Sequence, residues 1–250
     1  MLMCRPPTGW YAAVSTDQET IHSAFTLAVV TARAPEHIPM YQLPQFREES
    51  LTVQHALIRD NPLGLLISSG PDGVLANPIP FLIYEEGALG TLRCHLSRGN
   101  PQWQALRDNP EALVVFQGVD HYVTPSWYPQ KAIDHKVVPT WNYAMVQARG
   151  RALIVEDPAW LLANVAALAD AHEGSRPRPW SVADAPEAFI ASQLKGIVGV
   201  EIVIETIAGK FKASQNRPVA DRMGVAEGLA AEGDAHALAM RELVKVRGGV

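Results

Sequence analysis

The stretch Leu63-Gly-Leu-Leu-Ile-Ser-Ser-Gly-Pro-Asp-Gly-Val74 contains the pattern that sets the class of fold. A short apolar strand runs into a turn cluster, and Asp72-Gly73 is a strong signal for a β-hairpin. The chain then continues as a strand over residues 74–84. Pro78 and Pro80 restrict this strand to an edge or a bend, because proline cannot donate to a sheet ladder.

More strands follow at short intervals, which is typical of an antiparallel barrel or sandwich. We expect them at residues 89–95, 112–116, 137–155 and 198–206, with a bulge at Gly150 and a turn at Ala208-Gly209. Helical spacing and capping residues predict helices at residues 48–59 and 101–107, after Asp157-Pro158, at residues 186–195, and twice after Pro218 with a break at Gly233. The pattern therefore predicts an α+β, mainly β fold.

Composition narrows the class of protein. The 250 residues are 48% hydrophobic and 19% charged, as in an ordinary soluble globular protein. The net charge of −5 argues against broad binding to nucleic acid or acidic membranes. Cys4 and Cys94 form neither a metal-binding spacing nor a disulfide framework, which favours a cytoplasmic setting. No apolar run approaches the roughly 20 residues of a membrane span.

Residues 1–39 differ from the rest, because they show no clear strand or helix period. Met40 looks like a second beginning of the chain. We therefore expect residues 1–39 to be a loosely ordered extension, with a docked arm as the alternative.

Residues 92–103 predict an anion site at the point where a strand passes into a helix. Asn100 suits the N-cap and Pro101 suits the first helical position. Free backbone N–H groups and the helix dipole would then favour an anion such as a phosphate. The alternative is a strand-to-helix connection that binds nothing. The candidate binding residues here are His95, Ser97, Arg98, Asn100 and Trp103.

Two aromatic segments could receive a flat heterocycle. Residues 120–131 combine aromatic residues and prolines with Ser126 and Lys131, and we expect them to be irregular. In the second segment, Thr140-Trp-Asn-Tyr143, strand alternation would place Trp141 and Tyr143 on one face and Thr140 and Asn142 on the other. The alternatives are a loop pinned by aromatic packing and a pair of core aromatics.

Residues 209–216 predict a phosphate clamp. Lys210 and Lys212 share one face of a strand, with Phe211 opposite and with Ser214 and Gln215 following. The alternative is a solvated edge whose lysines discourage aggregation. The sequence has no HExxH, GxGxxG or P-loop motif, and Asp170, His172 and Glu173 are expected to be a solvated helix end rather than a metal site.

Together these segments resemble the PaiB-like family of FMN-binding negative transcriptional regulators. The resemblance runs from Met40 to about Gly228 and lies in an ordered set of motifs: Met40-Tyr…Pro44…Phe46, Asp72-Gly73…Asn77-Pro-Ile-Pro80, His95-Leu-Ser-Arg-Gly-Asn-Pro-Gln-Trp103, Tyr122…Pro125-Ser-Trp-Tyr128…Lys131, Val138-Pro-Thr-Trp-Asn-Tyr143, Ile197-Val-Gly199 and Gly209-Lys-Phe-Lys…Ser-Gln-Asn216. Ala213 departs from the leucine that is more common in the family, a difference expected to affect packing.

The resemblance implies a split β-barrel over residues 40–216, with residues 217–250 as a helical segment packed on it. It also implies a homodimer with FMN at the subunit interface. The expected function is negative regulation of transcription; an FMN-dependent reductase of a small molecule and a non-catalytic flavin-binding module are the alternatives. The helix pair after Pro218 lacks the polar start of a DNA-reading helix, so direct DNA binding is not expected from it.

In the expected site, the helix after Asn100 receives the phosphate with Ser97 and Arg98. Lys210 and Lys212, from the same chain or from the partner, add positive charge. Trp141, Asn142 and Tyr143 border the flavin ring, and His95 or Lys131 donates near its pyrimidine edge. No residue is assigned as a catalytic acid or base, and no metal is expected.

Overall fold

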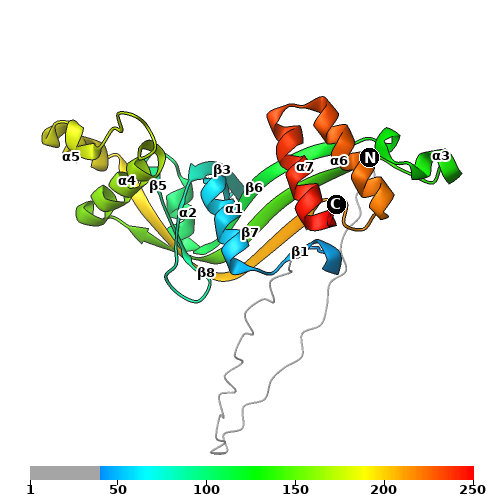
Figure 1. Ribbon diagram of the computed structural model, residues 1–250. Coiled ribbons are helices and arrows are strands. Elements are labelled where there is room, and N and C mark those ends of the chain that lie inside the picture. The colour runs from blue at the N-terminus through cyan, green and yellow to red at the C-terminus, as the bar shows by residue number, and fades with distance from the viewer. Residues whose placement is uncertain (1–39) are drawn as a thin grey trace, which may run out of the picture. The chain divides into compact units, whose positions relative to one another are not determined.

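The computed structural model describes residues 40–250 (Figure 1). The expectation for residues 1–39 lies outside the described residues. The strands are β1 (Arg47–Glu48), β2 (Leu63–Gly70), β3 (Gly73–Pro80), β4 (Leu82–Tyr84), β5 (Thr91–Ser97), β6 (Glu111–Val123), β7 (Thr140–Val155) and β8 (Ile197–Lys212). The α-helices are α1 (Leu51–Asp60), α2 (Gln102–Asp108), α3 (Gln130–Asp134), α4 (Pro158–Glu173), α5 (Glu187–Leu194), α6 (Val219–Glu232) and α7 (Ala235–Gly248). Short 3-10 helices are η1 (Pro44–Phe46), η2 (Pro125–Trp127) and η3 (Val182–Asp184).

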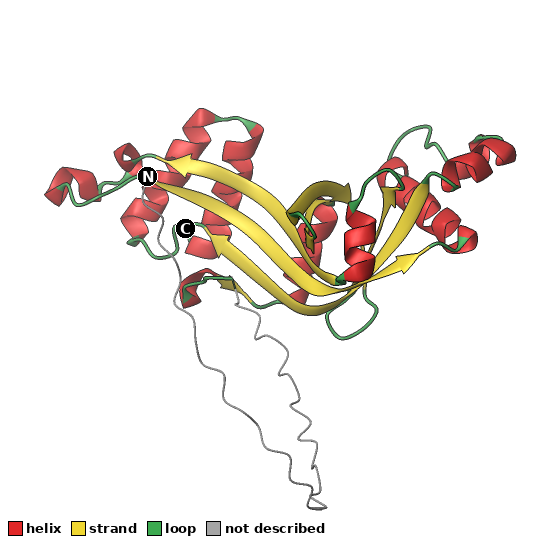
Figure 2. Ribbon diagram, turned by 180° about the vertical axis from the view of Figure 1, so that it is seen from behind, coloured by secondary structure: helices red, strands yellow, loops and turns green. Residues whose placement is uncertain are grey.

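The strands form one antiparallel sheet in the order β3-β2-β6-β7-β8-β5-β4, with β1 added to β8. The hairpin expected at Asp72-Gly73 joins β2 to β3, and Gly73 has a positive φ of 118°. Strand β3, with its two prolines, lies at the edge of the sheet as predicted. Figure 2 shows β6, β7 and β8 as long, curved neighbours.

Gly150 marks the expected bulge, because the pairing of β7 with β8 shifts register between Arg149 and Gly150. A Cβ atom at Gly150 would lie 2.0 Å from the Val203 carbonyl oxygen, so the bulge leaves no room for a side chain.

The predicted turn at Ala208-Gly209 is wrong, because β8 continues without interruption to Lys212. The glycine instead serves a close approach of two strands. A Cβ atom at Gly209 would lie 2.9 Å from the Glu48 Cβ atom on β1. Strand β8 therefore pairs with β5 along its first half and with β1 near its end.

Two apolar clusters hold the described residues together. The larger one lies inside the curved sheet, where Phe81 and Phe116 meet edge to face with ring centroids 5.7 Å apart. The smaller one joins α6 and α7 to the end of β6, and Leu229, Met240 and Val244 are buried in it. Figure 1 shows α6 and α7 at one end of the long strands and α4 and α5 at the other.

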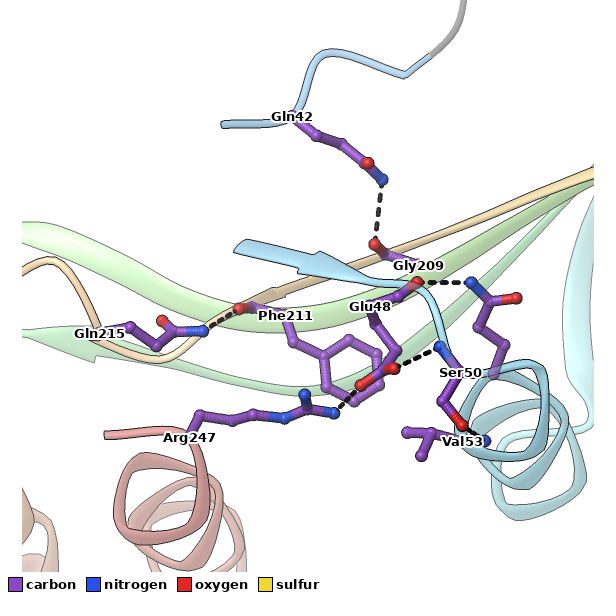
Figure 3. Close-up of polar contacts among 9 residues, drawn as sticks. Gln42, Glu48, Ser50, Val53, Gly209, Phe211, Gln215 and Arg247 are labelled. Carbon is purple, nitrogen blue, oxygen red and sulfur yellow. Dashed lines mark hydrogen bonds and ion pairs between the residues drawn. The ribbon is translucent and has the colours of Figure 1, made fainter. Parts of the chain in front are cut away.

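The segment before α1 is held by polar contacts across the sheet (Figure 3). The buried Glu48 carboxylate accepts hydrogen bonds from the Ser50 N–H at 2.7 Å and from the Arg247 guanidinium of α7. The Gln42 side chain donates to the Gly209 carbonyl at 3.0 Å. These contacts fix the residues just before β1 against the end of β8.

Asp157 should contribute measurably to stability as the cap of α4. Its carboxylate accepts hydrogen bonds from the N–H groups of Ala159 and Trp160, as the Asp-Pro pattern predicted. We expect Asp157→Ala to lower the free energy of unfolding in urea by about 1 kcal/mol. Asp157→Asn keeps a capping oxygen and should cost much less; equal losses in both variants would contradict the capping role.

None of the helices that the structure describes in residues 40–250 is both long enough and apolar enough to span a membrane.

Candidate functional site

A cavity of about 380 Å³ lies where β7 begins and β8 ends. Its lining contains four aromatic rings and two lysines: Tyr41, Leu43, Phe46, Thr140, Trp141, Tyr143, Lys210 and Lys212. Antiparallel pairing of β7 with β8 sets Tyr143 opposite Lys212 and so brings the predicted aromatic segment to the predicted lysine pair. The sequence thus identified both strands of this cavity.

The two lysines lie on one face of β8 as predicted, while Phe211 is buried on the other. The Lys210 ammonium donates to the Tyr41 carbonyl at 3.0 Å and lies 5.5 Å from the centroid of the Tyr143 ring. The Lys212 ammonium donates to the Thr140 hydroxyl and to the Trp141 carbonyl. The segment that carries Tyr41 therefore orients the Lys210 ammonium, and the start of β7 orients the Lys212 ammonium.

Lys210 and Lys212 bring positive charge into the lining of the cavity, and Arg217 lies outside the lining but near enough to affect Lys212. Burial lowers the pKa of Lys212, and repulsion from Lys210 and Arg217 lowers it further. Within residues 40–250, no Asp or Glu forms an ion pair with any of these three cations. Three neighbouring cations without a carboxylate repel one another, and a bound anion would relieve that repulsion. The site therefore fits a phosphate group.

The wall of the cavity fits a flat ring. The Trp141 side chain is 54% exposed and the Tyr41 side chain 75%. Tyr122 supports Trp141 from the side, with ring centroids 5.9 Å apart and planes at 68°. Exposed aromatic faces beside a cationic group are suited to a ligand that combines a planar heterocycle with a phosphate.

Three predicted flavin contacts have internal roles instead. Asn142 is buried and donates to the Ser214 hydroxyl at 2.9 Å. Gln215 accepts from the Ala213 N–H at 2.7 Å and donates to the Phe211 carbonyl at 2.6 Å. These bonds stabilise the turn after β8, where Ser214 has a positive φ of 61°. The prediction that Asn142, Ser214 and Gln215 face the ligand is corrected, because their polar groups are used within the chain.

The strand-to-helix loop at residues 97–103 is also satisfied internally. The expected N-cap is shifted by one residue, because α2 begins at Gln102 and Pro101 is its N-cap. The Asn100 side chain still accepts from the Gln102 N–H at 3.0 Å, and the Ser97 hydroxyl accepts from the Gly99 N–H at 3.2 Å. Trp103 donates from its indole to the Arg98 carbonyl at 3.0 Å. The expectation of several free N–H groups for a phosphate is therefore wrong.

Arg98 is also engaged with its own chain. Its guanidinium forms an ion pair with Glu156 at 2.7 Å and donates to the Lys195 carbonyl at 3.0 Å. The structure thus gives Arg98 a role in joining the loop to the strand that precedes α4 and to the residue that follows α5.

One chain does not bring Asn100 and Lys212 to the same phosphate. Ser97 pairs with Ile197, the first residue of β8, whereas Lys212 is its last residue. A strand of 16 residues covers roughly 50 Å at about 3.3 Å per residue. Within one chain the predicted site therefore divides into two separate regions, and only a second copy, as the sequence analysis allowed, could bring Lys210 and Lys212 to the loop before α2.

His95 lies with the loop region and is mostly buried. Its Nδ1 atom is 3.4 Å from the Asn164 side-chain nitrogen on α4, and burial lowers the pKa of the imidazole. Because its pKa is lowered, the imidazole is neutral at neutral pH. Within this chain His95 contacts α4 and does not line the cavity at Lys212.

Ser126 and Lys131 lie in a third place. Lys131 donates to the Ser126 hydroxyl at 3.3 Å, and both line a cavity of about 740 Å³ between the η2–α3 segment and α6. The prediction that residues 120–131 are irregular is wrong, because β6 extends to Val123 and the helices η2 and α3 follow it.

Two residues at or near the candidate site were missed by sequence reasoning. Tyr41 reaches the cavity because β1 pairs with β8, which no local pattern indicates. Arg217 lies beyond the turn at Ser214, and its guanidinium stacks 4.7 Å from the centroid of the Tyr128 ring. Its basic character five residues after Lys212 was the available signal.

Comparison with known proteins decides the family. Residues 40–206 match a family model described as "Putative FMN-binding domain". This chain belongs to that family. FMN is the family's cofactor, so the expected cofactor is confirmed, and the resemblance to PaiB-like proteins is confirmed as well.

Relatives of the FMN-binding family extend over most of the chain. An uncharacterized protein of Aspergillus fumigatus is 35% identical over 84% of this chain and 98% of its own length. A Bacillus subtilis relative, named protease synthase and sporulation protein PAI 2, is 31% identical over 75% of this chain and 88% of its own.

Solved structures confirm the split-barrel fold of the family. A conserved hypothetical protein of Mycobacterium tuberculosis matches with a TM-score of 0.51 at 16% identity, over 71% of this chain and 94% of the other. An FAD- and heme-binding protein of Mycobacterium smegmatis matches with a TM-score of 0.50 at 17% identity, over 66% and 73%. The α+β, mainly β split barrel was thus predicted correctly.

Proposed function

We propose that this member of the FMN-binding family holds FMN in the cavity at the ends of β7 and β8. Lys210, Lys212 and Arg217 would hold the phosphate, and Trp141 and Tyr143 would flank the isoalloxazine ring. The observation that carries this assignment is the group of three cations without a carboxylate partner in residues 40–250. Bound FMN supplies a two-electron redox centre.

We further propose that two copies of the chain close this site. In one copy Tyr41, Trp141 and Tyr122 are 75%, 54% and 41% exposed, so a flat ligand would be covered on one side only. A second copy would bury these rings and exclude water from the ligand. Light scattering should therefore give the mass of a dimer for the FMN-loaded protein.

The biological role we propose is negative regulation of transcription, as for a PaiB-like protein. The Bacillus subtilis relative, whose name links it to protease synthesis and sporulation, supports this role. Direct DNA reading by α7 has little support, since Arg241 and Lys245 pair with Glu242 and Arg247 pairs with Glu48. The regulator would therefore act through the FMN-loaded dimer or a further protein.

The test begins with the visible spectrum of the purified protein before and after addition of FMN. We expect a 1:1 complex with a perturbed flavin spectrum and a raised melting temperature at saturating FMN. Absence of both changes would overturn FMN binding. Oxidation of NADPH at enzymatic rates with a small acceptor would replace the regulatory role by a reductase role.

FMN affinity should fall at alkaline pH because of Lys212. The ammonium form binds the phosphate, and the pKa of Lys212 is lowered from the ordinary value for lysine, about 10.4. Affinity is therefore full below the lowered pKa and decreases as pH rises through it. Fluorescence titrations of FMN over this range should show the loss, whereas riboflavin, which has no phosphate, should not. The same pH dependence for both ligands would contradict the assignment.

A further inference from the structure

A cluster of three metal-ligating side chains lies outside the FMN site. His121 comes from β6, Glu232 ends α6, and Asp234 stands just before α7. One nitrogen of His121 and one oxygen of each carboxylate lie within 4.8 Å of one another. The strand and the α6–α7 corner thus bring together an imidazole and two carboxylates, a donor set typical of zinc and related divalent ions.

The orientation of His121 directs one ring nitrogen, Nε2, toward the carboxylates. Its Nδ1 atom lies 2.7 Å from the Tyr122 carbonyl oxygen, which can only accept a hydrogen bond, so Nδ1 carries a proton. Its Nε2 atom faces a Glu232 carboxylate oxygen at 3.0 Å. Metal-binding histidines commonly donate their other ring N–H to a backbone carbonyl, which aims the remaining lone pair at the metal.

The two carboxylates have acceptor capacity beyond their present contacts. Asp234 accepts the Ala237 N–H at 2.9 Å and caps α7, and the His236 N–H also donates to this carboxylate. The two oxygens of a carboxylate offer about four lone-pair sites, so capping and coordination can coexist. The side chain of His121 is 14% exposed and that of Glu232 is 45% exposed, so the cluster opens to solvent on the carboxylate side. A histidine that binds a metal through Nε2 does so as neutral imidazole, so this donor set would carry a charge of −2 in the bound state, which a divalent cation would neutralise.

We propose that His121, Glu232 and Asp234 bind one divalent transition-metal ion of the zinc class, with water completing the coordination. The ligand atoms would approach to about 2.0–2.2 Å from the metal. Tetrahedral ligands at that radius lie roughly 3.4 Å from one another, close to the present spacing of the His121 and Glu232 atoms. The bound ion would link the connection between α6 and α7 to β6. The proposal does not depend on FMN binding.

Cobalt(II) titration of the full-length, FMN-loaded protein tests the site. After dialysis against a chelator, we expect 1:1 binding with a ligand-field absorption band that zinc abolishes by competition. His121→Gln and Glu232→Gln should each weaken cobalt binding at least about tenfold, because each removes a direct ligand. Asp234→Asn should do the same while keeping the helix cap, since asparagine and aspartate cap equally well.

Matched controls separate this site from incidental histidine binding. His236→Gln, two residues after Asp234, and His172→Gln, at the end of α4, should leave cobalt affinity unchanged. Zinc should raise the melting temperature of the wild type but not of His121→Gln. An aqueous cobalt spectrum in the wild type, or undiminished binding in His121→Gln, would overturn the proposal and leave the cluster as a His121–Glu232 ion pair.

Discussion

The double variant Lys212→Met/Arg217→Met is expected to weaken FMN binding by about a hundredfold while leaving riboflavin binding unchanged. Each hydrogen bond from a charged donor to a phosphate is worth roughly 1.5–3 kcal/mol, and a tenfold change in affinity corresponds to about 1.4 kcal/mol. Methionine keeps an unbranched, flexible apolar side chain but removes the charge. The loss should therefore appear only for the ligand that has a phosphate.

Isothermal titration with FMN and with riboflavin measures this difference directly. Lys212→Met alone should lose about tenfold for FMN, since one charged contact disappears. Arg98→Met is the matched control at the far end of β8, where the guanidinium is paired with Glu156, and it should bind both ligands as the wild type does. A selective loss of FMN in Arg98→Met, with none in Lys212→Met, would move the phosphate to the loop before α2.

The strands of this site were predictable because their signals are local. Alternation at Lys210-Phe-Lys212 placed both lysines on one face, and the structure has them there. The alternation at residues 140–143 likewise predicted that Trp141 and Asn142 lie on opposite faces, and in the structure Asn142 is buried while Trp141 is exposed. The antiparallel pairing of β7 with β8, which sets Tyr143 opposite Lys212, is a long-range contact that these local patterns do not specify.

The use of polar groups was not predictable from residue types. An amide such as that of Asn142 or Gln215 can serve a ligand or a turn, and only the neighbouring hydrogen-bond partners decide which. Arg98 has the right charge for a phosphate. It forms an ion pair with Glu156, however, which lies almost 60 residues further along the sequence. Glycine is common in turns, so Ala208-Gly209 was interpreted as one. In the structure Gly209 instead allows Glu48, which is distant in the sequence, to pack closely against β8.

The position of the two lysines relative to the loop after β5 was not predictable from local patterns. A turn was expected at Ala208-Gly209, whereas the continuous strand places Lys210 and Lys212 at the end of β8 opposite to that loop. Within one chain the two predicted phosphate-binding groups lie apart, and a site that unites them needs a second copy, as the sequence analysis allowed.

Arg247→Leu is expected to lower the free energy of unfolding by about 3 kcal/mol, because it leaves a buried carboxylate without its cation. Glu48 is 6% exposed, and its ion pair with Arg247 joins β1 to the last turn of α7 (Figure 3). The guanidinium also stacks 4.6 Å from the centroid of the Phe211 ring. Leucine retains part of that apolar contact, so most of the loss should be electrostatic.

A double-variant cycle separates the two contributions. Glu48→Gln keeps an acceptor for the Ser50 N–H, and Glu48→Gln/Arg247→Leu should recover most of the stability that Arg247→Leu loses in urea. Arg247→Leu should also weaken FMN binding, because β1 holds the segment that carries Tyr41 against Lys210. If FMN affinity stays at the wild-type level while stability falls, Tyr41 is not held in place by β1 and its assignment to the site fails. If the double variant is no more stable than Arg247→Leu, then Arg247 stabilises the fold through its contact with the Phe211 ring rather than through its ion pair with Glu48.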